Sequence, residues 1–187
     1  MLETIRTKIR ALIEDSPQKG FDTFTYTNYA TFTLSEENIL SITKVTLNGT
    51  ELGTGQYIYD ANTNKITITM TGLSQGAIII IDYTYNKYSD VELNEYIRAS
   101  LVWISLYSYQ ETDYELDEEG ISPTPNNKTT DLIALVSSIL IKPDYTTYKM
   151  STVTVIYSGR IPKEDKIEKL IAKFKYSIGI CGVLEIV

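Results

Sequence analysis

The chain has 187 residues, of which 43% are hydrophobic, and its 17 basic and 24 acidic residues give a formal charge of −7. This length fits one domain, or one domain with a large insertion, and provides enough apolar residues for a core. Nucleic-acid-binding proteins normally show a broad basic surface, and none is evident in this sequence. We expect no signal peptide, because the first residues (MLETIRTKIRALIE) mix charges throughout, and no membrane segment, because no apolar run is long enough.

The residue types also narrow the possible chemistry. There is no histidine, which removes histidine-based triads, most zinc sites and the commonest general base at neutral pH. The single cysteine, Cys181, has no histidine partner and is predicted to be a packed or incidental thiol. Residues 53–57 (GTGQY) lack the lysine and the spacing of a phosphate loop and predict a turn. We therefore expect no enzymatic activity, no metal site and no cofactor.

The first part of the chain predicts a short helix and then strands. Residues 2–14 carry apolar side chains at helical spacing among basic ones, which predicts an amphipathic helix. From 21 to 85 the pattern has period two and is rich in β-branched and aromatic residues. Asn48-Gly49 predicts a type I′ hairpin turn. Residues 77–81 (AIIII) are apolar on both faces and predict the most buried strand.

A long helix is predicted directly after the β region. Ser89 and Glu92 have the spacing of a capping box. The residues that follow are apolar on every side of a helix, which predicts a central helix buried nearly all round, with Trp103 in the core. Thr124 is predicted to cap the next apolar helix, with Pro125 at its first position.

The last part of the chain predicts an extended segment, a helix and a tail rich in β formers. Residues 151–159 predict a strand or an extended arm. A helix is expected to begin near Pro162 with one apolar and one basic face. The basic face could touch nucleic acid or be solvated, and the interrupting acids Glu164, Asp165 and Glu168 favour solvation. Its basic residues are Lys166, Lys169 and Lys173.

The order of these elements predicts an α+β fold. One helix precedes the β region and three follow it, so the β region resembles an insertion into a helical bundle. We expect a bundle of about four helices formed by residues 1–20 and 86–187. Residues 21–85 are expected to form an inserted antiparallel β-sandwich or open barrel of roughly five to seven strands.

Acidic residues concentrate in one loop after the long helix. They are Glu111, Asp113, Glu115, Asp117, Glu118 and Glu119. The other acidic residues nearly balance the 17 basic ones, so this loop carries most of the net charge. Asp113, Glu115 and Asp117 have the alternate spacing of a calcium loop. However, the positions that need glycine and glutamate hold Glu118 and Thr124, which favours a solvated loop.

Several segments resemble structural proteins of tailed bacteriophages. The first is a strand that ends in Y-x-Y and leads through S-D-x-E-L into a helix, as in YTYNKYSDVELNEYIRASLVWIS at 83–105. Residues 122–144 and 161–179 are similar to later helices of the same proteins. Residues 45–69 resemble small β modules of phage neck and tail components. The family that the chain resembles is the head–tail adaptor, also called the connector or neck ring protein.

This resemblance implies a structural role in the virion neck. Such proteins form homo-oligomeric rings, usually dodecameric, below the portal and extend the DNA channel. The implied partners are further copies, the portal protein and the next neck or tail protein, and DNA passes without specific binding. The protein would be made in the cytoplasm of the bacterial host. Many adaptors are smaller and mostly helical, so the β region leaves the neck layer open.

Two further expectations concern partners. The apolar tail is predicted either to form an arm that binds the portal or a neighbouring copy, or to pack on its own domain. The residues proposed for the arm are Gly179, Ile180, Val183, Leu184, Ile186 and Val187. An alternative function is a β-sandwich binding module of a phage tail or baseplate that recognises a glycan or a protein.

Overall fold

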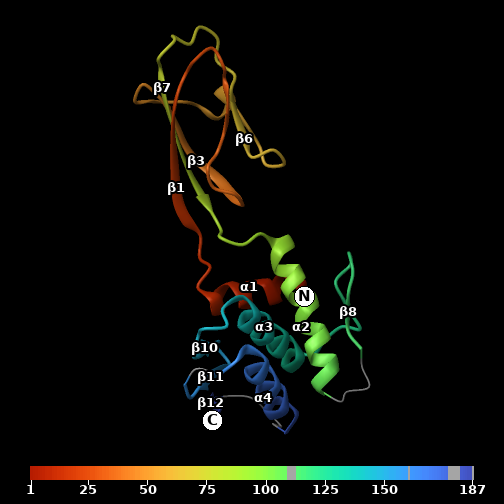
Figure 1. Ribbon diagram of the computed structural model, residues 1–187. Coiled ribbons are helices and arrows are strands. Elements are labelled where there is room, and N and C mark those ends of the chain that lie inside the picture. Colours follow the sequence, from red (N-terminus) through yellow and green to blue (C-terminus); the bar gives the residue numbers. More distant parts are fainter. Residues whose placement is uncertain (109–112, 160, 177–181, 187) are drawn as a thin grey trace. The chain divides into compact units, whose positions relative to one another are not determined.

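The computed structural model describes residues 1–108, 113–159, 161–176 and 182–186. The chain forms two compact units. The helical unit comprises Met1–Asp15 and Ser89–Val187, and the β unit comprises Ser16–Tyr88. The fold is α+β, with the β unit inserted between the first and second helices of the helical unit (Figure 1).

The β unit is a sandwich of two antiparallel sheets. The larger sheet has the order β1-β7-β3-β4, formed by Gln18–Thr25, Ile78–Tyr85, Ile39–Leu47 and Thr50–Glu51. The smaller sheet has the order β2-β6-β5, formed by Thr31–Thr33, Lys65–Ile68 and Tyr57–Asp60. A single 3₁₀ turn, η1 (Thr54–Gln56), precedes β5. The turn after β3 contains Asn48 and Gly49, both with positive φ, which confirms the predicted two-residue hairpin.

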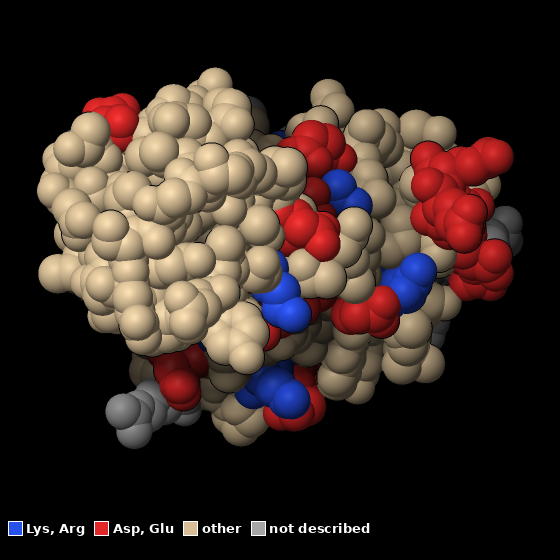
Figure 2. Space-filling view, turned by 90° about the horizontal axis from the view of Figure 1, so that it is seen from above, with Lys and Arg blue, Asp and Glu red and all other residues tan. Residues whose placement is uncertain are grey.

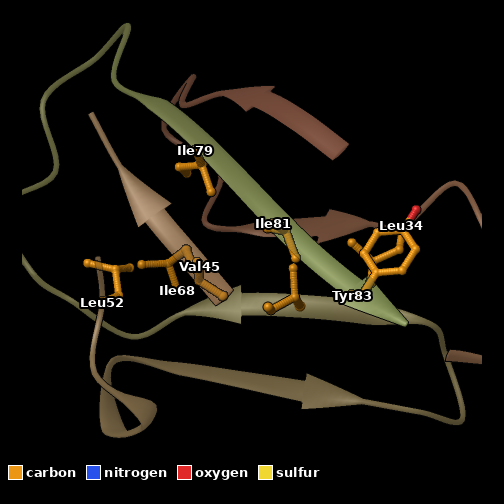
Figure 3. Close-up of a cluster of buried hydrophobic side chains, with 8 residues drawn as sticks. Leu34, Val45, Leu52, Ile68, Ile79, Ile81 and Tyr83 are labelled. Atoms are coloured by element: carbon orange, nitrogen blue, oxygen red, sulfur yellow. The ribbon is translucent and has the colours of Figure 1, made fainter. Parts of the chain in front are cut away.

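The core of the β unit lies between the two sheets. Ile66 and Ile68 of β6 are buried, whereas Thr67 between them is not, as period-two alternation requires. Figure 3 shows how Val45, Ile79, Ile81 and other apolar side chains of the larger sheet contribute to the same cluster. Burying each such side chain stabilises the fold by about 1.5–3 kcal/mol. Strand β7, which contains the segment predicted to be the most buried strand, lies between β1 and β3 and buries Ile79, Ile81 and Tyr83, although Ile78 is exposed and burial alternates along the strand.

The helical unit is built around its third helix. The helices are α1 (Leu2–Ile13), α2 (Asp90–Ser108), α3 (Asn127–Ile141) and α4 (Lys163–Tyr176). Helix α3 contacts each of the other three helices. Ten consecutive or nearly consecutive side chains of α3 are buried, including Ile133, Leu135 and Ile139. Helix α3 is therefore the axis of the unit.

The prediction that α2 is buried nearly all round is wrong. Val91, Val102 and Leu106 are exposed, and Trp103 is only half-buried, with its ring stacked on Tyr107. Apolar composition shows how much of a helix could be buried, but not how many neighbours cover it. The other helices pack against only one side of α2.

The cap predicted for α2 is present in the structure, whereas the cap predicted for α3 is not. At α2, the Ser89 amide donates to Glu92 Oε2 at 2.7 Å and the Glu92 amide donates to Ser89 Oγ at 3.0 Å, which confirms the capping box. At α3 the predicted Thr124 cap is wrong. Asn126 takes this role, because its Oδ1 accepts from the Thr129 amide at 2.9 Å.

Two arginines of α1 fix the segments that border the β unit. Arg10 pairs with Asp15, the last residue before the β unit, and with Asp90 at the start of α2, at 2.8 Å. Arg6 also contacts Asp90, at 3.2 Å, and donates to Asn94 Oδ1 at 3.0 Å. The chain therefore leaves and re-enters the helical unit at positions held by one ion-pair network.

A small sheet completes the helical unit. Its order is β10-β11-β12, formed by Thr147–Lys149, Val153–Tyr157 and Gly182–Ile186. Strand β11 pairs with β10 antiparallel and with β12 parallel, and α4 forms the crossover that a parallel pair needs. The sequence predicted an extended segment at 151–159 and left open that the tail packs on its own domain, but it did not identify this segment as the tail's partner.

Lys166 does not belong to the solvated face predicted for the last helix. Its exposed fraction is 1%, and its Nζ donates to the Pro143 and Tyr145 carbonyls at 2.5 and 2.8 Å. The ammonium also lies 5.4 Å from the ring centroid of Tyr157. Burial lowers the pKa of Lys166, and the charge of Asp144 partly opposes this shift. The residue ties α4 to the segment after α3.

Candidate partner-binding groove

Helix α2 presents a stripe of exposed side chains to solvent. Val91, Val102 and Leu106 are 71%, 59% and 68% exposed, and Glu95 and Arg98 lie between them on the same helical face. Isolated exposed apolar residues are ordinary, but Val102 and Leu106 are one turn apart and form a continuous patch. The sequence pattern did not predict this exposed face, because α2 was expected to be buried on every side. The charged residues at positions 95 and 98 were the feature of the sequence that could have indicated an exposed face on this helix.

A short acidic hairpin lies beside this part of α2. Its strands are β8 (Glu115–Leu116) and β9 (Ile121–Ser122), which pair antiparallel. Ser105 Oγ of α2 donates to Asp113 Oδ1 at 2.8 Å, which ties the start of the hairpin to the helix. Asp117 closes the turn by accepting from the amides of Glu119 and Gly120, each at 2.9 Å. The hairpin is therefore an ordered element.

A groove of about 550 Å³ separates the hairpin from α2. Its apolar surface comes from Leu101, Val102 and Leu106 on the helix and from Tyr114 and Leu116 on the hairpin. Its polar lining is Arg98, Ser105, Asp113 and Glu115. Of the acidic loop residues predicted from sequence, two therefore line a groove and three lie on the adjoining turn. Glu111 lies outside the described residues.

The hairpin side of the groove is strongly negative. Asp113, Glu115, Asp117, Glu118 and Glu119 form no ion pair with any residue that the structure describes. Arg98 lines the groove but already contacts Glu95 on its own helix. The red side chains at the right of Figure 2 show how acidic groups gather where β8 lies. This side of the groove therefore attracts cations.

The predicted partner-binding tail lies in two environments. Val183 is exposed and Leu184 is half-buried, but Ile186 is buried in the sheet of its own unit. Ile186 therefore reaches a partner only if β12 leaves β11, which corrects its assignment to a free arm. Strand β12 lies at one edge of its sheet. Gly179, Ile180 and Val187 lie outside the described residues.

The β unit carries a second, polar cavity of about 640 Å³ near the chain connections. Asn64 organises it, because its Nδ2 donates to the carbonyls of Leu34 and Glu36 at 3.1 and 2.8 Å. The Tyr59 hydroxyl donates to Asn64 Oδ1 at 3.1 Å. The cavity offers hydroxyls and amides beside an aromatic ring.

Within the described residues, no three His, Cys, Asp or Glu side chains come together in a group that could hold a metal ion. No helix among these residues is both long and apolar enough to cross a bilayer. Comparison with known proteins adds no relative: the chain matches no protein-family model and no curated protein sequence.

Proposed function

We propose that this protein is a non-enzymatic structural component of a tailed-phage virion, a head–tail adaptor. In this proposal, copies form a homo-oligomeric ring, dodecameric in the usual case, below the portal and extend the DNA channel. The observation that carries the proposal is the uncovered apolar face of α2 beside an acidic hairpin. A contiguous open patch of this kind marks an interaction site more often than an ordinary surface.

Two further features support an assembled protein. Strand β12 at the sheet edge has the geometry that pairs with an added strand, which suits contact between neighbouring copies in a ring. A ring of one repeated contact needs two different surfaces on each copy, because its interfaces are heterologous. The edge of β12 offers one of these two surfaces to a neighbouring copy.

The charge of the chain suits a DNA conduit. With a formal charge of −7, the protein repels phosphate more than it attracts it, so DNA can pass without being held. The partners in this proposal are further copies, the portal protein and the next neck or tail protein. The protein is made in the cytoplasm of the bacterial host and resides in the virion neck.

Particle composition tests this proposal. Quantitative mass spectrometry of purified particles of the virus that encodes the chain should find it at a copy number comparable to that of the portal protein. Immunogold labelling should place it at the neck. A chain that is strictly monomeric and absent from purified particles contradicts the proposal.

A second candidate function is a β-sandwich binding module of a phage tail or baseplate. It is favoured by the polar cavity at Asn64, which Tyr59 also lines. Hydroxyl, amide and aromatic groups together suit a glycan or a neutral protein surface. Binding of the full chain to a glycan array, with labelling of tails rather than necks, favours this second function over the adaptor.

A further inference from the structure

We propose that the groove between α2 and the acidic hairpin binds a basic amphipathic helix of another protein, and not a second copy of this chain. That the other protein is a neighbour in the virion rests on the proposed function. The chemistry of the groove does not, because it follows from the residues that line it.

The floor of the groove fits the apolar face of a helix. Val102 and Leu106 are more than half exposed, one turn apart, and face Tyr114 and Leu116 across the groove. An amphipathic helix that inserts side chains at i, i+3 and i+4 covers a patch of this form.

The edge of the groove selects the charge of the occupant. Asp113 and Glu115 line it, and the turn adds three more carboxylates without cationic partners among the described residues. An acidic occupant is repelled, whereas lysine or arginine beside the apolar face gains several exposed ion pairs. Each such pair contributes only about 0.2–1 kcal/mol and is screened by salt. The apolar contacts therefore supply affinity and the carboxylates supply specificity.

The described part of this chain offers no basic amphipathic helix as an occupant. The basic side chains of α1, Arg6, Lys8 and Arg10, are already paired with carboxylates of their own unit. On α4, Glu164, Asp165 and Glu168 interrupt the lysines, and Lys166 is buried. Charge complementarity therefore points to a different protein.

A pair of synthetic peptides tests the proposal on the full chain. One is an amphipathic helix of leucine and lysine, and the other has every lysine replaced by glutamate. Binding is measured by calorimetry and by the fluorescence of Trp103, the single tryptophan, which lies on α2. We expect the lysine peptide to bind at low salt at least tenfold more tightly than the glutamate peptide, and to weaken as salt rises.

Matched variants locate the binding site. Leu106→Asp should weaken binding of the lysine peptide at least tenfold, because it puts a charge on the floor of the groove. Val91→Asp is the control, since Val91 is equally exposed on α2 but does not line the groove. Glu115→Lys should weaken the lysine peptide and strengthen the glutamate peptide. Far-UV circular dichroism checks that all variants stay folded.

Several results overturn the proposal. The site is elsewhere if Leu106→Asp and Val91→Asp behave alike, and the charge argument fails if both peptides bind equally. Self-association of the wild-type chain that Leu106→Asp abolishes makes the occupant a second copy. Absence of binding at millimolar peptide also contradicts the groove assignment. None of these results depends on particle composition, so failure of the adaptor proposal is measured separately.

Discussion

The exposed surfaces of the two units differ in their charged and apolar side chains. At the end of the β unit that is opposite the chain connections, the segments 26–30, 48–56 and 69–77 contain a single charged residue, Glu51. The surface of this unit that is turned to the viewer in Figure 2 is almost free of charged side chains. The helical unit instead exposes an apolar stripe next to a cluster of carboxylates.

The two surfaces differ in whether other parts of the same unit contact them. The far-end segments of the β unit are tied together by backbone hydrogen bonds, including Tyr26 with Gly76 and Ala77, and Thr69 with Gln56. Asn48 Oδ1 also accepts from the Ile78 amide at 2.8 Å. Backbone amides and carbonyls of these loops therefore find hydrogen-bond partners within the β unit. Among the residues that the structure describes, no element covers the apolar face of α2 in this way, and this is why we propose a partner for the helical unit.

The core of the helical unit should show the largest effect of a single substitution. Ile133 is fully buried on α3, so Ile133→Ala should lower the free energy of unfolding by about 2–5 kcal/mol. Val102→Ala on the exposed face should change it by less than about 0.5 kcal/mol. Urea unfolding followed by Trp103 fluorescence measures both. Equal losses in the two variants would contradict the assignment of α3 as axis and α2 as open face.

The buried tyrosines should make stability fall at alkaline pH. Burial raises the pKa of the Tyr148 and Tyr157 hydroxyls above their ordinary value of 10.0, and Asp144 adds to the shift at Tyr148. Above pH 10.0 the unfolded chain loses these protons while the folded chain keeps them, so the free energy of unfolding falls. The slope is up to about 1.4 kcal/mol per pH unit for each tyrosine.

Tyrosine-to-phenylalanine variants identify the source of that slope. Tyr148→Phe and Tyr157→Phe should each make the alkaline decline of the free energy of unfolding shallower. Each also loses one hydrogen bond, from Tyr148 to the Lys142 carbonyl or from Tyr157 to the Lys166 carbonyl. An unchanged slope in the double variant would assign the decline to other groups.

Lys166 should matter for folding although it is a lysine on a helix. Lys166→Ala leaves the Pro143 and Tyr145 carbonyls without their donor and opens a space in the core, so we expect a loss of about 1–3 kcal/mol. Lys166→Met restores packing and should recover part of the loss. The control is Lys163→Met on the exposed side of α4, with little effect. An unchanged free energy of unfolding in Lys166→Ala would refute the structural role of Lys166.

The capping box of α2 should have a smaller effect. Ser89→Ala removes the acceptor of the Glu92 amide and should lower the free energy of unfolding by about 1 kcal/mol. Ser89→Asp keeps an acceptor at the same position and serves as the matched control. Thermal unfolding monitored by circular dichroism compares the two. Equal stability of the alanine and aspartate variants would show that the cap is not formed.

Much of the fold could be predicted from local pattern. The four helices, the Asn48-Gly49 turn and the cap at Ser89 follow from short-range rules on spacing and turn geometry. What failed depended on long-range packing. Burial on α2, the environment of Lys166 and the pairing of β12 with β11 are set by neighbours distant in sequence. The groove was missed for the same reason, although its acidic edge was visible in the composition.

The central claim is that the apolar face of α2 is covered by a partner in the assembled particle. Its most direct test is maleimide labelling of Leu106→Cys in a Cys181→Ser background, with denatured protein as the reference for full labelling. We predict rapid labelling of the free protein and strong protection in purified particles. Equal labelling of the free protein and of particles that contain it would contradict the account.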